Sequence, residues 1–127
     1  TLLLAPMAAT ALGACSDSDT PLALFEPEIA NVTDSFQLQA SGLTGVTTSV
    51  DYNWENTGTE ADIDQSGVLT GGEASLTILD AAGSTVYTAD LASTGSYQST
   101  SGQAGMWIVR LTTTDAQGDL NFRVQKP

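Results

Sequence analysis

Apolar and polar residues alternate along much of this chain with a period of two, which is the period of a β-strand rather than a helix. The stretches 35–40, 46–55 and 119–125 show the pattern most clearly. In the second stretch, one face would carry Val46, Thr48, Val50, Tyr52 and Trp54. Such alternation is typical of antiparallel sheets that have one face in water.

Turn signals separate these stretches at strand-like intervals. Asp80-Ala81-Ala82-Gly83 lies between two apolar segments, and Asp115-Ala116-Gln117-Gly118 lies between two others. In each, the Asp can cap a turn and the Gly can adopt a positive φ, so both are predicted to be hairpin loops. Further breaks are predicted at 56–58, 71–72 and 102–105.

The pattern predicts an all-β protein, an antiparallel β-sandwich of about seven or eight strands. A barrel is the second choice, because the turns are irregular. Jelly-roll and immunoglobulin-like topologies both stay open, since the Cys…Trp…Cys signature is absent. The segment from Gly105 to Leu111, followed by Gly118 to Val124, resembles the last hairpin of extracellular bacterial sandwich modules.

The first fourteen residues are uncharged and mostly apolar, unlike the rest of the chain. They are too short to span a membrane comfortably and match the apolar region of a signal peptide. A Met and a basic region would precede such a segment, so we expect its true start to lie upstream of Thr1. The signal peptide is therefore assigned to residues 1–14.

Leu12-Gly13-Ala14-Cys15 resembles the lipobox of bacterial lipoproteins, an aliphatic residue and two small ones before a Cys. The resemblance implies cleavage between Ala14 and Cys15 and acylation of the Cys15 thiol. Two or three acyl chains, at about 0.8 kcal/mol per buried CH₂, would hold the protein on a membrane. Residues 15–33 would form the lipidated Cys and a polar tether, and 34–127 the sandwich. By analogy with enterobacterial sorting, Ser16 favours the outer membrane of the bacterial envelope.

Charge and composition exclude several functions. The 127 residues include fifteen acidic and three basic ones, a formal net charge of −12, which disfavours binding to nucleic acid. The chain has no His and one Cys. It therefore lacks the usual base of a nucleophilic enzyme, an internal disulfide, and a zinc site built on thiolates and imidazoles. We expect no enzymatic activity.

The acidic row Glu60, Asp62 and Asp64 is the sharpest polar feature of the sequence. Same-face carboxylates repel one another, and Ca²⁺ would relieve that repulsion through oxygen ligands. No other cofactor is expected. A solvated edge that resists aggregation is the simpler interpretation, and a glycosidase pair is the least favoured.

The aromatic residues divide into two groups. Trp54 and Trp107 each share a strand face with apolar residues, so both are predicted to lie in the core. Tyr97 has polar neighbours and is a candidate ligand-binding aromatic. The sequence thus predicts a lipid-anchored, non-enzymatic binding or structural module whose partner is an envelope protein or a glycan. The alternatives are a carbohydrate-binding module and a calcium-dependent adhesion module.

Overall fold

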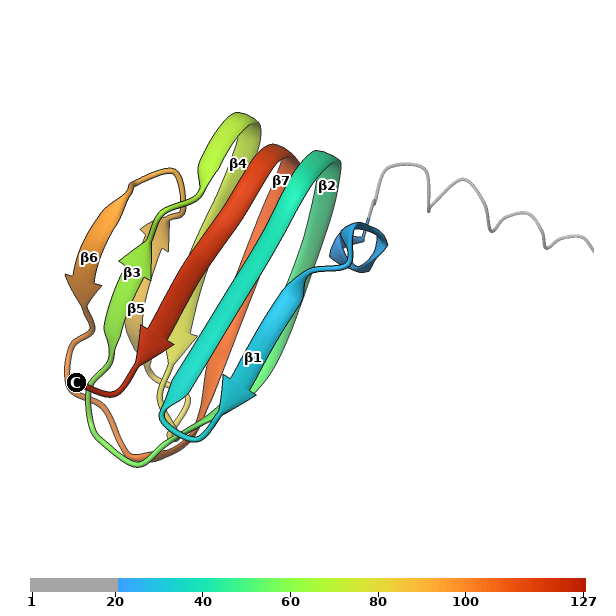
Figure 1. The fold of residues 1–127 in the computed structure, drawn as a ribbon. Coiled ribbons are helices and arrows are strands. Elements are labelled where there is room, and N and C mark those ends of the chain that lie inside the picture. The colour runs from blue at the N-terminus through green and yellow to red at the C-terminus, as the bar shows by residue number, and fades with distance from the viewer. Residues whose placement is uncertain (1–20) are drawn as a thin grey trace, which may run out of the picture.

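The computed structural model describes residues 21–127. In this range the chain is all β, apart from the short 3-10 helix η2 (Leu22–Phe25), and every strand pairing is antiparallel (Figure 1). The strands are β1 (Glu28–Val32), β2 (Ser35–Asn56), β3 (Asp62–Gln65), β4 (Val68–Leu79), β5 (Thr85–Asp90), β6 (Gly95–Gln98) and β7 (Gly105–Gln125).

Two long strands organise the sheet. The main path runs β1-β2-β7-β3-β6, and β4 pairs with β7 on one side and with β5 on the other. β2 has 22 residues and β7 has 21, and the two pair along almost their whole length. Because β7 also pairs with β3 and β4, it is the strand on which the others converge.

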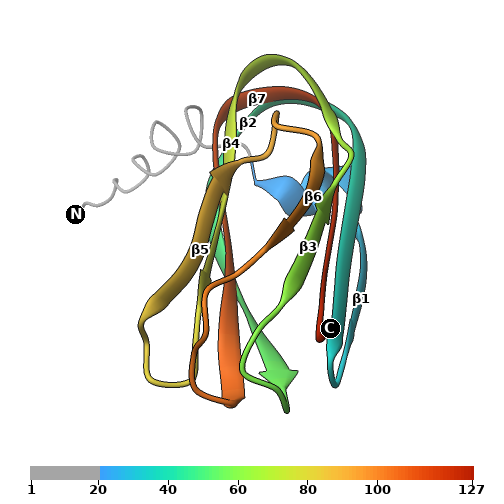
Figure 2. The same ribbon diagram turned by 90° about the vertical axis from the view of Figure 1, so that its left-hand side faces the viewer.

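The long strands fold over at one end of the molecule, so that the sheet forms two facing layers (Figures 1 and 2). The β1–β6 layer contains β1, β3, β6, the first part of β2 and the last part of β7. The β4–β5 layer contains β4, β5 and the remaining parts of β2 and β7. Where the strands fold over, β-bulges or similar irregularities shift the register of β7 against β2 and against β4. Positive φ angles occur there at Gly42, Gly45, Gly72, Asp115 and Gly118.

One predicted hairpin is confirmed and the other is wrong. Asp80–Gly83 does connect β4 to β5, with Gly83 at φ 87°. Asp115–Gly118 instead lies inside the continuous strand β7, which bends there without reversing. The resemblance to a closing hairpin therefore does not hold. Gly71 and Gly72, predicted to be a break, lie likewise within β4.

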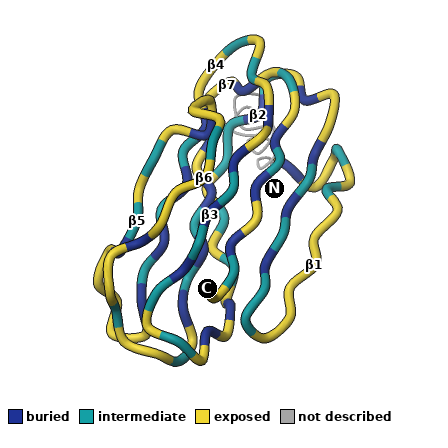
Figure 3. The backbone as a smooth tube through the Cα atoms, turned by 60° about the vertical axis from the view of Figure 1, so that its left-hand side comes forward, coloured by how far each residue is buried: buried dark blue, intermediate teal, exposed yellow. Residues whose placement is uncertain are grey.

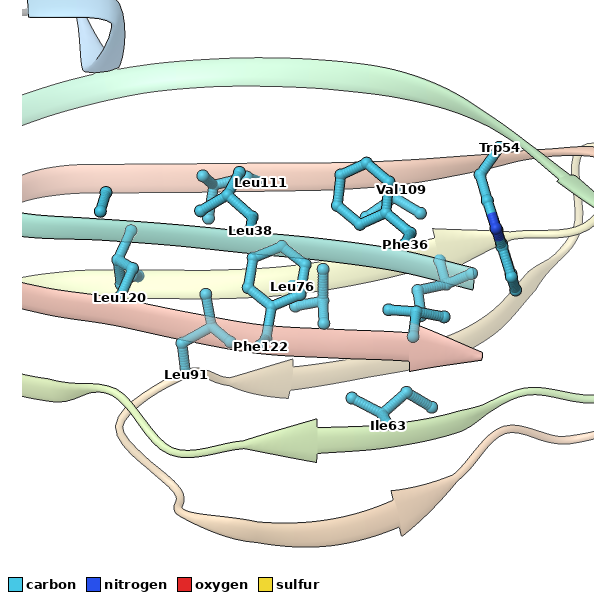
Figure 4. Packing of buried hydrophobic residues seen from close by; sticks show 14 of the residues in the cluster. Phe36, Leu38, Trp54, Ile63, Leu76, Leu91, Val109, Leu111, Leu120 and Phe122 are labelled. Atoms are coloured by element: carbon cyan, nitrogen blue, oxygen red, sulfur yellow. The ribbon is translucent and has the colours of Figure 1, made fainter. Parts of the chain in front are cut away.

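The core lies between the two layers and contains the apolar positions of the sequence pattern (Figure 4). Phe36 stacks on Phe122 at 5.9 Å between ring centroids, and Tyr52 lies 5.3 Å from Phe36. Side chains with no exposed surface include Phe36, Leu38, Val46, Ile63, Leu76, Ile78, Val109, Leu111, Phe122 and Val124. The strand faces predicted from the alternation are thus confirmed.

Trp54 and Trp107 are both fully buried, as predicted. Their rings meet edge to face, with centroids 5.8 Å apart and planes at 88°. Each indole N–H donates to a backbone carbonyl, of Val32 for Trp54 and of Gln103 for Trp107. The two side chains therefore fill one end of the core without leaving a buried polar group unpaired.

The sheet is not closed, because β1, β5 and β6 each pair on one side only. On the β5–β6 side, which we call the tyrosine seam, Tyr87 and Tyr97 lie with ring centroids 6.3 Å apart. The buried Gln65 accepts a hydrogen bond from Tyr87 Oη at 2.7 Å and donates to the carbonyls of Asp90 and Ser93. These side chains therefore link β3 and β5 with the loop that leads to β6.

The folded part starts earlier than predicted. β1 pairs with β2 ahead of the boundary expected at residue 34, and Leu22 of η2 is buried. The predicted signal segment and its acylation residues Ala14 and Cys15 lie outside the described residues. Within residues 21–127, no helix has the length and apolar character needed to cross a membrane.

Candidate functional site

The outer surface of the β1–β6 layer is rich in side-chain amides. The polar residues that alternate with the buried Phe36 and Leu38 on β2, with Phe122 and Val124 on β7, and with Ile63 on β3 point away from the core. β6 continues this surface at the edge of the layer (Figure 1). We call it the amide face, and it consists of Gln37, Gln39, Asp62, Asp64, Ser96, Gln98, Asn121, Arg123 and Gln125.

The strand register places these side chains in rows across the layer. In one row Gln37 lies opposite Arg123, which lies opposite Asp64 and then Ser96. In the next row Gln125, Asp62 and Gln98 are neighbours. Because adjacent strands lie about 4.8 Å apart, each row presents hydrogen-bonding groups at a regular spacing.

Most of the amide groups make no hydrogen bond within the part of the chain that the structure describes. Among the described residues, the side chains of Gln37, Gln39, Asn121 and Gln125 make no hydrogen bond to another residue, and neither does that of Arg123. A primary amide offers two donors and an acceptor, and a guanidinium offers five donors. The amide face can therefore bind a polar ligand without breaking internal hydrogen bonds.

An open groove of about 480 Å³ lies at the β3–β6 end of this face. It brings together three of the residues singled out from the sequence, Asp62, Asp64 and Tyr97, with Gln98 and Gln125. The fourth, Glu60, lies beside it, because its Oε1 accepts a hydrogen bond from Gln98 Nε2 at 3.3 Å. The sequence candidates thus belong to one region of the surface.

The acidic row is not gathered into a calcium site. Asp64 Oδ1 accepts a hydrogen bond from Ser96 Oγ at 2.6 Å, and Glu60 accepts bonds from Gln98 and Ser101. Within residues 21–127, no group of three or more acidic, His or Cys side chains is placed to hold a metal ion. The donors to Asp64 and Glu60 are hydroxyl and amide groups of β6 and the following loop.

Tyr97 lies at the border of the groove rather than standing out from it. Its side chain is 37% exposed, and its Oη lies 3.3 Å and 3.2 Å from the carbonyl oxygens of Ser93 and Thr94. Its ring packs towards Tyr87 in the tyrosine seam. A little over a third of this predicted ligand-binding aromatic is therefore available to a ligand.

A second groove, of about 450 Å³, lies at the other end of the amide face near η2. Gln39 and Asn121 line it and so connect it with the amide face. Phe25 adds an aromatic surface, and Glu26, Glu28 and Asp119 add carboxylates.

Two of the three basic side chains are held in ion pairs away from this surface. Arg110 Nε lies 2.8 Å from Asp51 Oδ1 on the β4–β5 layer, and this hydrogen bond and charge lower the pKa of Asp51. Lys126 Nζ lies 3.6 Å from Asp34 Oδ2. Arg123 is the basic residue that the amide face itself carries, beside Asp64.

The sequence does contain a signal for the amides, since Gln37, Gln39, Asn121 and Gln125 are the polar positions of the alternating stretches. Alternation shows that they face water, but it does not show which strands are neighbours. The pairing of β7 with both β2 and β3 is what gathers them into one surface.

The chain has few similarities to known proteins. No protein family matches the chain, and no curated protein is similar to it. A solved structure described as "Structure of infectious bursal disease virus Gt strain" is similar over 79% of this chain, at 15% identity and a TM-score of 0.31. The chain spans 30% of that chain's length. At this low similarity, no feature of the viral protein is transferred to this chain.

Proposed function

We propose that this chain is a non-enzymatic binding module of the bacterial cell envelope, anchored by lipid at Cys15, that binds its ligand through the amide face. The observation that carries the binding role is the set of amide and guanidinium groups of Gln37, Gln39, Asn121, Arg123 and Gln125, which share one surface and make no hydrogen bond to another described residue. The lipobox resemblance at Leu12–Cys15 supports the anchor, and Ser16 favours the outer membrane.

The fold supports a module of this kind. We propose that the two layers form a β-sandwich rather than a barrel, because the edges at β1, β5 and β6 do not pair with one another. Jelly-roll and immunoglobulin-like arrangements are the candidate topologies. In either one, a polar outer face is held rigid by the core beneath it.

The anchor is tested by mass spectrometry of the protein purified from the membranes of its native host. The expected mature chain begins at Cys15 and carries the mass of a diacylglyceryl group, with or without a third acyl chain. A Cys15→Ser variant should remain unacylated and leave the membrane fraction. A native chain that retains Leu12 to Ala14, or an unmodified Cys15, would contradict the proposal.

The alternative to an envelope protein as the ligand is a neutral polysaccharide. Amide groups in rows can both donate hydrogen bonds to the hydroxyl groups of sugars and accept hydrogen bonds from them. The burial of Trp54 and Trp107 argues against sugar binding by stacking on indoles. If a glycan is bound, hydrogen bonds from the amide face must provide the affinity. Acrylamide should then quench the Trp fluorescence weakly, and equally with and without a glycan.

The binding surface is tested with one pair of matched variants. Asn121 belongs to the amide face, whereas the amide of Asn53 lies on the outer surface of the β4–β5 layer. On a panel of neutral polysaccharides and envelope proteins, Asn121→Ala should weaken the best binder about tenfold, as expected for a lost hydrogen bond of about 1.4 kcal/mol. Asn53→Ala should leave binding unchanged. Equal losses in both variants would place the site elsewhere.

A further inference from the structure

β1 is an edge strand whose backbone, beyond its pairing with β2, makes one hydrogen bond within the described residues, from the indole N–H of Trp54 to the carbonyl of Val32. It pairs with β2 along one side, and no other described strand pairs with it. All five of its residues are exposed, as Figure 3 shows for the backbone of β1. The N–H and C=O groups along such an edge are a template for another strand.

The other side of the molecule is better protected. There, the backbone N–H of Thr100 donates to the carbonyl of Val86 on β5 at 2.9 Å. The rings of Tyr87 and Tyr97 fill the gap between β5 and β6. The edge of β5 is therefore partly covered by the protein itself.

Exposed apolar side chains are concentrated beside β1. Ile29 is 40% exposed and Val32 is 62% exposed, and Leu24 of η2, just before the strand, is 69% exposed. Within residues 21–127, these are three of the six large apolar side chains that are exposed. A soluble edge strand usually carries charges or Pro along its length, whereas here Glu28 is the one charged residue of the strand.

The charge of the chain indicates what would cover this edge. A second copy would bring two chains of formal net charge −12 together. The residues next to the edge, Glu26 and Glu28, would add to that repulsion. A basic segment would instead be attracted by the same charges, and its alternate apolar residues could cover Ile29 and Leu24.

We propose that the free edge of β1 binds an extended, basic segment of another protein, which adds a strand to the β1–β6 layer. Main-chain hydrogen bonds to β1 supply part of the affinity, and side chains on alternate positions supply the selectivity. This interaction uses the edge of the layer and does not depend on the ligand of the amide face.

The test uses two synthetic ten-residue peptides, one alternating Lys with Val and the other alternating Glu with Val. The Lys peptide should bind and protect from hydrogen exchange those amide protons of Glu28–Val32 that do not already bond β2, and the Glu peptide should bind at least tenfold more weakly. Ile29→Lys should weaken binding of the Lys peptide tenfold or more. Val32→Lys, at a more exposed position, tests the same edge if the first variant fails to fold.

Ala92→Lys is the matched control, because it adds the same charge in the exposed loop between β5 and β6. It should change the affinity by less than twofold. Equal weakening by Ala92→Lys would reduce the effect to general electrostatics and overturn the proposal. The proposal would also be overturned if the Lys peptide did not bind, if the Glu peptide bound equally well, or if the protected amides lay at another edge. It would be overturned as well if the wild-type protein formed a dimer that Ile29→Lys abolished.

Discussion

The carboxylate of Asp80 holds two separate loops together. Its Oδ1 accepts the backbone N–H groups of Ala82 and Ser84 in the β4–β5 turn, at 3.0 Å and 2.9 Å. Its Oδ2 accepts the N–H of Gln103, 2.9 Å away in the loop before β7. These backbone hydrogen bonds, with that of Ser84 the largest, lower the pKa of Asp80 below its usual value of 3.8.

Asp80 should therefore contribute to the acid sensitivity of the fold. Because its pKa is lowered in the folded state, its contribution is present above pH 3.8 and is lost as the pH falls through the folded pKa. Asp80→Asn should lower the melting temperature by about 5 °C at pH 7 and flatten its decline between pH 5 and pH 2. Asp90→Asn is the control, since Asp90 Oδ1 accepts one N–H, from Ala92. If the melting temperature of Asp80→Asn fell with decreasing pH in parallel with that of the wild type, Asp80 would not be a source of the acid sensitivity.

Tyr87 should ionise only in strongly alkaline solution. Burial, followed by repulsion from Tyr97, raises its pKa to about 12. Absorbance at the phenolate band during an alkaline titration should show one transition near that pH, and Tyr87→Phe should remove it. The stability linked to this group is present below pH 10 and is lost as the pH rises through about 12. If the absorbance transition near pH 12 were retained in Tyr87→Phe and lost in Tyr97→Phe, its assignment to Tyr87 would be wrong.

At the scale of elements, the fold-over of β2, β4 and β7 depends on backbone conformations that few residues adopt. Gly72 has a φ of 71°, and a Cβ at this position would overlap the backbone carbonyl of Asp115 on β7. The strands approach so closely there that the small size of glycine matters as much as its freedom of φ.

Two glycine substitutions separate these causes. Gly83 also has a positive φ, but a Cβ there would meet no atom within 4 Å. Gly83→Ala should cost only the strain of the left-handed conformation, about 1–2 kcal/mol. Gly72→Ala should cost at least twice as much, because β4 must also move away from β7. Urea unfolding measures both, and equal losses would show that contact between the strands is unimportant.

The sequence predicts strand faces better than strand connections. Phe36, Leu38 and Phe122 are buried, as the alternation predicted. Burial of one face of a strand determines which alternate residues point inward. The same Asp and Gly residues, however, can build either a reversal or a bulge, so Asp115–Gly118 could not be distinguished from Asp80–Gly83. β1 was missed because the sequence EIANV buries no face and so lacks alternation.

At the scale of the whole molecule, the last strand connects all the others. β7 pairs with β2, β3 and β4, and its final residues supply Phe122 and Val124 to the core. The candidate site depends on the same strand, since Asn121, Arg123 and Gln125 are its outward residues. Sequence reasoning could identify the polar positions but not this shared neighbour, because long-range pairing leaves no local pattern.

Removal of residues 121–127 should therefore abolish folding of the whole domain rather than disturb its C-terminal residues alone. The deletion takes away the pairings of β7 with β3 and with the first part of β2. It also exposes the core, where loss of one large aromatic costs about 3–5 kcal/mol. Near-UV circular dichroism should show no fixed tertiary signal and melting should lose cooperativity. Deletion of Pro127 alone is the control, and a cooperative transition in the longer deletion would contradict the role of β7.

The late position of β7 also has a consequence for biosynthesis. β2 and β4 lack their common neighbour until residues 105–125 have left the ribosome, so the complete sheet cannot assemble before this segment is free. Contacts this distant in sequence close slowly, on a timescale of milliseconds to seconds for β-rich domains. Until that segment is free, the earlier parts of the chain can form only the pairings that do not need β7, those of β1 with β2, of β3 with β6 and of β4 with β5.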